Sequence, residues 1–282
     1  MRARRLPAYA LAGLAQAASM AWPWGGEPLW WLQLLSLAAL TALLDGEQRQ
    51  ASGWRRPALG AWVFATTWLC GTFWWLFISM NTYGGLPAPL AALAVLFLGG
   101  GLAIYYGVAG GLWGWLAPRL SAGSRVLLFA AVWTLAELVR GSLFTGFPWG
   151  AGGYAHVDGP LAGYAPWLGV YGLGAAAAAS AACVGLWKRQ RRTGMLPLAA
   201  AVLLALPSGL GFMHSDGGPG ASTGRLSVAL LQGNIPQDEK FVPGSGIDTA
   251  LRWYGEQLQK NRAALVVTPE TALPLLPRQL PE

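Results

Sequence analysis

Charged side chains are scarce in this 282-residue chain. Asp, Glu, Lys and Arg together make up 11% of it, whereas soluble globular domains carry about 25%. Long stretches have no charge at all, and each is long enough to cross a bilayer core, which takes roughly 20 helical residues. The shortage excludes an ordinary soluble protein. It predicts an integral membrane protein with a more polar C-terminal part that begins near Gly217.

Cysteine and histidine are also rare, with two of each. Cys70 and Cys183 lie in separate apolar stretches, so they say little about the redox compartment. We interpret them as small buried hydrophobic residues rather than reactive thiols. His156 shares a loop with Asp158, but two ligands without a third make a poor metal site. We therefore expect loop hydrogen bonding there and no metal.

Positive charge exceeds negative charge, giving a formal net charge of +7. Nucleic-acid binding is one explanation for such an excess, but the distribution argues against it. The basic residues cluster in alternate loops between the apolar stretches, which is the positive-inside pattern of membrane proteins. We therefore expect no nucleic-acid partner. The clusters are Arg2, Arg4 and Arg5; Arg49, Arg55 and Arg56; Arg119 and Arg125; and Lys188, Arg189, Arg191 and Arg192.

The apolar stretches predict a transmembrane bundle of about seven spans within residues 1–216. The expected spans cover residues of about 7–22, 28–44, 58–80, 88–117, 125–143, 167–187 and 195–213. With the basic loops inside, the N-terminus is cytoplasmic and residues 217–282 lie on the outer face, which is the periplasm in a bacterium. A miscounted span, which would invert the C-terminal part, is the alternative.

Besides the spans, the bundle contains two glycine-rich features. Gly107 with Gly111, and Gly110 with Gly114, form two GxxxG pairs, for which we prefer close internal helix packing over dimerisation. The loop of residues 141–166 is rich in glycine and aromatic residues. Irregular backbone at membrane depth requires cover from protein or a cavity, so we interpret it as a re-entrant or interfacial segment bordering a lipid-accessible cavity.

Glu137 and Arg140 lie near the outer end of the span predicted at 125–143. Ionisable residues inside spans are functional candidates. An ion pair between positions three residues apart, anchoring the helix end, accounts for them equally well.

The pattern changes in residues 217–282. Apolar runs at 226–232 and 263–267 predict two buried strands, and Ser245 with Asp248 resembles a helix capping box between them. A strand, a helix and a strand indicate a βαβ unit and a parallel sheet. Because two parallel strands cannot bury both faces of a sheet, we expect this domain to be incomplete. The apolar positions at helical spacing are Ile247, Leu251, Tyr254 and Leu258.

One carboxylate, Glu270, directly follows the second predicted strand, inside the turn Thr268–Pro274. Functional residues of α/β folds lie at the carboxyl ends of strands, and a carboxylate there suits a general base. An exposed loop carboxylate or a charge at a helix N-terminus is the alternative. A lone carboxylate, however, has no nucleophile to activate.

Four motifs in sequence order carry a family resemblance. They are Tyr83–Pro87 (YGGLP), Thr145–Trp149 (TGFPW), Val228–Gln237 (VALLQGNIPQ) and Val267–Pro274 (VTPETALP). Together they resemble bacterial apolipoprotein N-acyltransferases over the whole chain. The resemblance implies a polytopic α-helical membrane bundle followed by an α/β nitrilase-like domain, in the bacterial inner membrane. A Glu-bearing turn alone would indicate only the wider nitrilase superfamily.

The resemblance also implies a reaction. The family uses a Glu–Lys–Cys triad, in which Glu270 matches the general base, the Cys forms a thioester with a phospholipid acyl chain, and the Lys stabilises the oxyanion. The α-amino group of a diacylated apolipoprotein then takes the acyl chain, with no cofactor. Phe241 stands where the family often has another aromatic residue. The other substrate-binding candidates are Tyr83, Phe147, Trp149, Gln232 and Asn234.

The chain departs from the family at the rest of the triad. The family's Lys and Cys follow the Glu, whereas Lys240 and Lys260 precede Glu270 and do not match. The family's closing C-terminal span has no match either. We therefore expect the 282-residue polypeptide alone to be inactive. A non-catalytic membrane remnant or lipid-binding scaffold is the alternative, and a transporter is disfavoured because so few ionisable residues lie in the spans.

Overall fold

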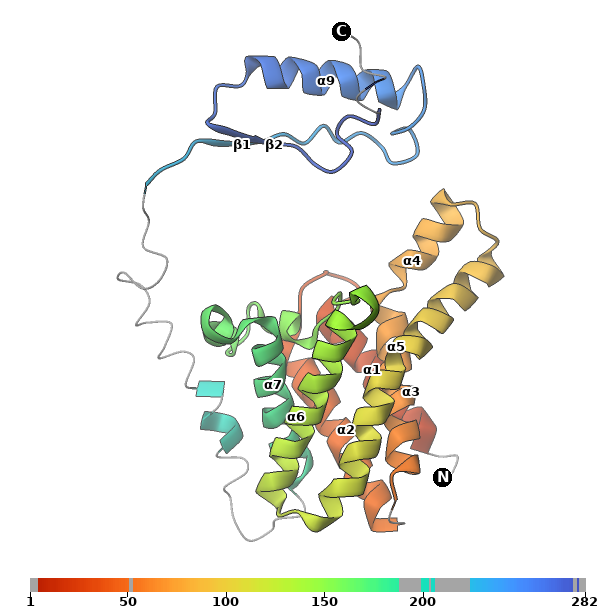
Figure 1. Ribbon diagram of the computed structural model, residues 1–282, viewed down its shortest axis with the longest axis vertical. Helices are drawn as coiled ribbons and strands as arrows, with labels where there is room; N and C mark the ends of the chain where they lie inside the picture. Colours follow the sequence, from red (N-terminus) through yellow and green to blue (C-terminus); the bar gives the residue numbers. More distant parts are fainter. Residues whose placement is uncertain are drawn as a thin grey trace. The chain divides into compact units, whose positions relative to one another are not determined.

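The computed structural model describes residues 5–50, 53–187, 199–202, 204–205, 224–275 and 278. Two compact units make up the chain, residues 1–215 and 216–282. The first unit is a bundle of helices, coloured red to green in Figure 1. Its α-helices are α1 (Leu6–Met20), α2 (Trp30–Gln50), α3 (Arg55–Thr72), α4 (Trp75–Ile78), α5 (Ala88–Leu116), α6 (Ala122–Ser142) and α7 (Ala165–Gly185).

Three helical segments among the described residues are long and apolar enough to cross a membrane. They are Ala88–Arg119, Ala122–Thr145 and Ala162–Gly185. Helix α3 and the segment Trp75–Tyr83 meet at a bend of 51° and make a fourth only if the two are counted as one broken span. Helix α1 has only 15 residues, and α2 carries Asp45, Glu47 and Arg49 near its end. The first unit is thus a helical membrane bundle, and the count of seven spans stays a prediction.

The predicted span at 195–213 lies largely outside the described residues. Within it, residues 199–202 and 204–205 are helical. The basic residues at 188–192 also lie outside the described part of the chain.

Aromatic side chains fill the centre of the bundle. Trp68 and Trp133 stack with ring centroids 5.6 Å apart, and Tyr106 meets Trp68 edge-on at 5.1 Å. Phe64 and Phe129 pack against Trp133 at 6.1 and 6.0 Å. All five side chains are at most 3% exposed, so α3, α5 and α6 share one core of interlocking rings.

The glycine pairs of α5 lie against α3. A Cβ added at Gly110 would collide with the Ala61 Cβ and come within 2.8 Å of the Pro57 carbonyl oxygen. One added at Gly114 would lie 2.6 Å from Pro57 Cγ. Close packing inside the bundle, which we preferred over dimerisation for these GxxxG pairs, is confirmed.

Alanine substitutions at two glycines of α5 test this contact. Gly110→Ala should destabilise the bundle by about 1–3 kcal/mol, the usual effect of overpacking a tight contact. Gly101 lies on the same helix with nothing within 4 Å of an added Cβ, so Gly101→Ala should stabilise the helix by roughly 0.5–1 kcal/mol. Thermal unfolding of both variants in the same detergent measures the difference, and equal shifts would contradict the packing.

Ion pairs close one end of the bundle, where α2 ends and α6 begins. Arg125 is buried and lies 3.3 Å from Asp45, which also pairs with Arg49 at 2.8 Å. Glu47 is buried and lies 3.5 Å from Arg5. Both carboxylates at this end are therefore paired with arginines. Arg125, which we assigned to a basic loop cluster, lies inside the bundle and forms one of these pairs.

The second unit contains β1 (Val228–Leu230), α9 (Gly246–Lys260) and β2 (Leu265–Val267). The two strands pair in parallel, with Val228 opposite Leu265 and Leu230 opposite Val267. Helix α9 packs over one face through Ala250 and Tyr254. The predicted βαβ unit is confirmed.

Two local expectations in this unit are wrong. The two strands are not buried as predicted: Leu230 is 76% exposed and Val267 is 42% exposed, because α9 covers only one face of the sheet and no other described element of this unit covers the second. The capping box does not form either. Ser245 makes no side-chain cap to α9, and its hydroxyl donates to the Glu239 carboxylate at 2.7 Å instead.

Candidate functional site

The carboxyl ends of β1 and β2 open into a pocket of about 430 Å³. Because parallel strands end at the same edge of a sheet, the segments after the two strands lie together, although they are far apart in the sequence. The pocket thus combines polar groups from two of the four sequence motifs. Its lining includes Leu231, Gln232, Asn234, Lys240, Tyr254, Thr268, Glu270 and Thr271.

Helix α9 fixes the segment that follows β1. The Gly233 N–H donates to the hydroxyl of Tyr254 at 3.0 Å, and Tyr254 itself is 3% exposed. Asn234 adopts a left-handed backbone with φ of 49°, a conformation that asparagine tolerates better than most residues. Its side-chain oxygen accepts from Gln232 Nε2 at 2.9 Å. The structure therefore brings Gln232 and Asn234 together.

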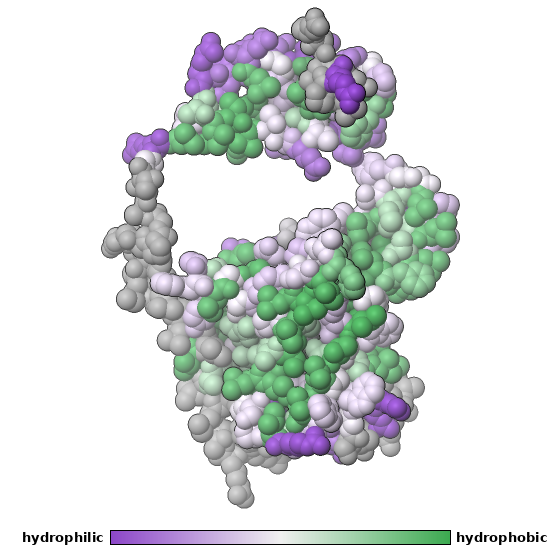
Figure 2. Space-filling view, viewed as in Figure 1, coloured by the Kyte–Doolittle hydropathy of each residue, from purple (hydrophilic) through white to green (hydrophobic). Residues whose placement is uncertain are grey.

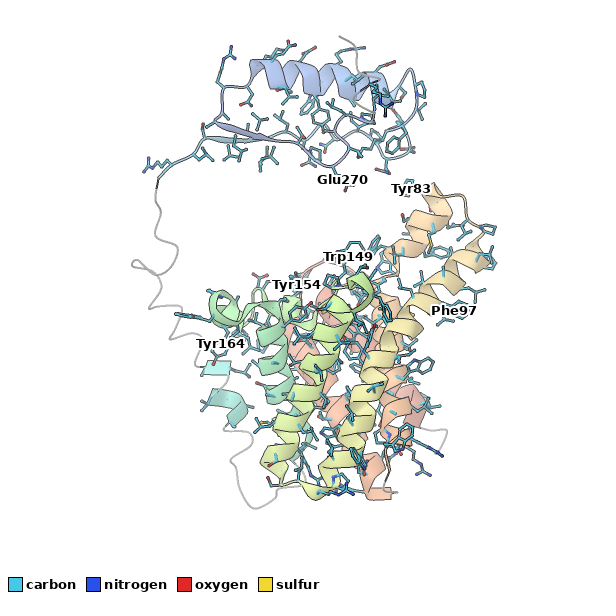
Figure 3. The ribbon with its side chains drawn as sticks, viewed as in Figure 1. Tyr83, Phe97, Trp149, Tyr154, Tyr164 and Glu270 are labelled. Atoms are coloured by element: carbon cyan, nitrogen blue, oxygen red, sulfur yellow. The ribbon has the colours of Figure 1, made fainter. Side chains whose placement is uncertain are left out.

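The segment after β2 carries Glu270. Its backbone carbonyl accepts from Lys240 Nζ at 3.1 Å and from the Thr271 hydroxyl at 2.7 Å. Thr271 has a φ of 53°, so the chain turns sharply right after the carboxylate. The Glu270 side chain lines the pocket and is exposed (Figure 3). These bonds fix the Glu270 backbone, while its carboxylate makes no hydrogen bond or ion pair among the residues that the structure describes.

A second group of candidates lies in the bundle. Phe147 and Trp149 contact each other with ring centroids 5.2 Å apart. Phe147 meets Phe73 edge-on at 5.0 Å, and Trp149 meets Trp75 at 5.6 Å. The TGFPW motif therefore packs on the bend between α3 and α4, and Trp149 remains 57% exposed.

Arg140 holds this motif to α6. Its Nη1 donates to the carbonyls of Phe147 and Trp149 at 2.7 and 2.8 Å, and its Nε donates to the Tyr106 hydroxyl at 3.0 Å. The backbone N–H of Phe147 returns a bond to the Arg140 carbonyl at 2.7 Å. Arg140 is 1% exposed, so a buried guanidinium fixes an exposed aromatic segment.

Glu137 and Gln33 hold the next part of the loop. Glu137 Oε1 accepts from the Gly152 N–H at 2.8 Å, and Gln33 Nε2 donates to the Gly152 carbonyl at 2.6 Å. Glu137 and Arg140 form no direct ion pair with each other in the part of the chain that the structure describes. The simple ion pair between them does not form, since each side chain binds loop backbone instead.

His156 completes the arrangement, with its Nε2 2.7 Å from Gln33 Oε1. Because Gln33 uses its amide nitrogen on Gly152, its oxygen must accept from the imidazole. The expected loop hydrogen bonding is therefore confirmed. His156 is fully buried, and this burial lowers the pKa of its imidazole to about 4.

Acid should loosen this loop through His156. The folded pKa of about 4 lies below the ordinary histidine pKa of 6.5, so the unfolded chain binds the proton more readily. The stability is fully present above pH 6.5 and is lost as the pH falls toward 4, about 2 kcal/mol of it by pH 5. When the pH is lowered from 7 to 5, the melting temperature of the native chain should fall roughly 4–8 °C further than that of His156→Gln. Equal falls would contradict the assignment.

Two sequence candidates stand apart from these groups. Tyr83 ends the π-helical turn Ser79–Tyr83 at the tip of a hairpin formed with the start of α5, and it is 56% exposed (Figure 3). Phe241 is likewise 56% exposed and does not line the pocket beside Glu270. Conversely, Lys240, Tyr254 and Gln33 support the two sites but were not predicted. The helical spacing predicted Tyr254 only as a core residue, and no feature of the sequence indicated a role for Lys240 or Gln33.

Comparison with known proteins agrees with the motifs. The profile described as "Apolipoprotein N-acyltransferase N-terminal domain" matches residues 12–183. A protein of Verminephrobacter eiseniae named "Apolipoprotein N-acyltransferase" is 58% identical over 284 residues, covering 98% of this chain and 53% of the relative. Relatives with the same name occur in Ralstonia nicotianae, 44% identical over 90% of this chain and 47% of the relative, and in Pseudomonas putida, 38% identical over 95% and 53%. The chain thus spans about half the length of the curated relatives it matches.

Proposed function

Because this chain belongs to the apolipoprotein N-acyltransferase family, we propose that it acts in N-acylation of bacterial lipoproteins. The acyl donor is a membrane phospholipid, and the acceptor is the α-amino group of an N-terminal diacylglyceryl-cysteine. Residues 1–216 form the membrane bundle, and residues 217–282 supply the βαβ unit that carries the base of a nitrilase-like domain.

Glu270 is the general base in this proposal. It takes the proton of a cysteine thiol, whose thiolate attacks the ester carbonyl of the phospholipid and releases a lysophospholipid. A lysine stabilises the tetrahedral oxyanion. The acceptor amine then attacks the thioester, forms the amide and returns the thiol. The 282 residues contain Cys70 and Cys183 only, both within helices of the bundle, and neither matches the family's nucleophile.

One observation supports this proposal most strongly. Glu270, Gln232 and Asn234 come from two separate motifs, yet they line one pocket at the carboxyl edge of a parallel sheet. Lys240 acts there as a positioning residue, because it binds the Glu270 backbone rather than the carboxylate. Trp149, held beside the partly buried Phe147, provides an exposed aromatic side chain suited to lipid near headgroup depth.

The proposed location is the inner membrane, with the N-terminus in the cytoplasm and residues 217–282 in the periplasm. The basic clusters in alternate loops support this orientation. It would place the Glu270 pocket on the side where lipoproteins receive their third acyl chain.

A chimera tests the function. This chain would replace the matching segment of the Verminephrobacter relative, which supplies the remainder of the protein. We expect the purified chimera to transfer acyl chains from phospholipid to a diacylated lipopeptide, and the 282-residue polypeptide alone to transfer none. A folded chimera without transfer activity would favour the non-catalytic scaffold.

A further inference from the structure

An apolar groove runs along the outside of the bundle between α3 and α5, at the end opposite the loop of residues 143–164. Its volume is about 620 Å³. Small residues form its floor, where Gly107 and Gly111 face Ala58. Its walls include Trp54, Leu59, Trp62, Ile104, Val108, Leu112 and Trp115.

The groove is about as long, measured along α5, as one membrane leaflet is thick. Along α5 it extends from Ile104 to Trp115, which is about 16 Å of helix at about 1.5 Å per residue. Half of a hydrocarbon core of about 30 Å is close to this length. The Trp62 Nε1–H donates to the Gly100 carbonyl at 2.9 Å, so its one polar group is already bonded and its ring offers an apolar face.

Three arginines lie next to the tryptophans at one end of the groove, two by contact and one by sequence. The Arg55 guanidinium lies over the Trp54 ring at 5.6 Å, and Arg56 follows it in sequence. Arg119 donates one bond to the Trp115 carbonyl at 2.8 Å, leaving most of its five donors available. All three are exposed, and none makes an ion pair within the described residues. The nearby carboxylates, Asp45 and Glu47, are already paired with other arginines.

An apolar groove as long as one leaflet is thick, with arginines that form no ion pair within the described residues at its basic end, matches an amphiphile with an acyl chain and an anionic head. We propose that the α3–α5 groove binds an anionic phospholipid from the leaflet that contacts the basic end of the bundle. Basic pockets between membrane helices favour anionic headgroups through the same attraction. Figure 2 shows hydrophilic residues at the lower edge of the bundle and hydrophobic residues above them.

Native mass spectrometry of the whole chain tests this site. The protein in detergent would be titrated with phosphatidylglycerol and, separately, with zwitterionic phosphatidylcholine. We expect phosphatidylglycerol to bind at least about tenfold more tightly. Each arginine near an anionic headgroup increases the affinity about fivefold. The triple variant Arg55→Gln, Arg56→Gln and Arg119→Gln should therefore bind phosphatidylglycerol on the order of 100-fold more weakly. The control triple, Arg225→Gln, Arg252→Gln and Arg262→Gln, removes the same charge from exposed positions of the other unit.

A second pair of variants tests the groove itself. Val108→Trp fills it from an exposed position, while Leu127→Trp adds the same ring to an exposed position on α6 outside it. Val108→Trp should abolish the preference for phosphatidylglycerol and Leu127→Trp should retain it. Equal affinity for both lipids, or equal losses in the two arginine triples, would overturn the proposal. So would a dimer that Val108→Trp disperses, because the occupant would then be a second copy of the chain.

Discussion

Glu270→Gln in the chimera should lower the rate of acyl transfer about 10²–10⁴-fold, the usual contribution of a general base. The substitution keeps the size and hydrogen-bonding shape of the side chain but removes its capacity to take the thiol proton. The backbone bonds from Lys240 and Thr271 to the Glu270 carbonyl do not depend on the carboxylate. The turn should therefore keep its shape, and phospholipid KM should change far less than kcat.

Glu256→Gln is the matched control. Glu256 lies exposed on α9 of the same unit and pairs with Lys260 at 3.0 Å. An exposed pair of this kind contributes little to stability, so this variant should keep the activity of the parent chimera. If both variants lose activity alike, the effect is on folding, and if neither does, Glu270 is not the base.

Arg140→Gln should have the largest effect on the bundle. The guanidinium bonds two loop carbonyls and the Tyr106 hydroxyl in a buried site, and losing bonds to a buried charged donor costs about 3 kcal/mol. With about 2–4 °C per kcal/mol for a unit of this size, the melting temperature should fall by roughly 6–12 °C. Thermal unfolding followed by a thiol-reactive dye measures this in a Cys70→Ala background, because Cys70 is only partly buried whereas Cys183 is 2% exposed in the folded bundle.

Arg56→Gln removes the same charge from an exposed position of the same bundle and should shift the melting temperature by less than about 2 °C. In the Arg140→Gln chimera, transfer should also fall, since Phe147 and Trp149 are no longer held on the bend between α3 and α4. A melting temperature equal to that of Arg56→Gln would contradict the clamp.

Periodicity and charge distribution predicted the main elements because they reflect local physics. The scarcity of charge indicated the membrane bundle, the 3.6-residue spacing around Tyr254 indicated α9, and the apolar runs on either side indicated two parallel strands. The glycines of α5 indicated a close helix contact, which α3 provides. Each of these features depends on a repeat that is visible along a short segment.

Long-range contacts could not be predicted in the same way. Arg140 bonds carbonyls, which every residue carries, so its partners Phe147 and Trp149 have no signature. Gln33 reaches Gly152 and His156 across more than one hundred residues of sequence. Ser245 resembled a helix cap, but the competing Glu239 carboxylate takes its hydroxyl. One face of β1 and β2 is exposed because only α9 covers the sheet. The hydrophobicity of the strands does not indicate how many elements cover them.

The central claim is that Glu270 activates the nucleophile, and formation of the acyl-enzyme tests it most directly. The chimera would be mixed with phospholipid in the absence of acceptor, and the hydroxylamine-sensitive acyl thioester would be followed in a single turnover. We predict rapid accumulation in the parent chimera and a rate about 10²–10⁴-fold lower in Glu270→Gln. Accumulation of the thioester at the parental rate in Glu270→Gln would contradict the account.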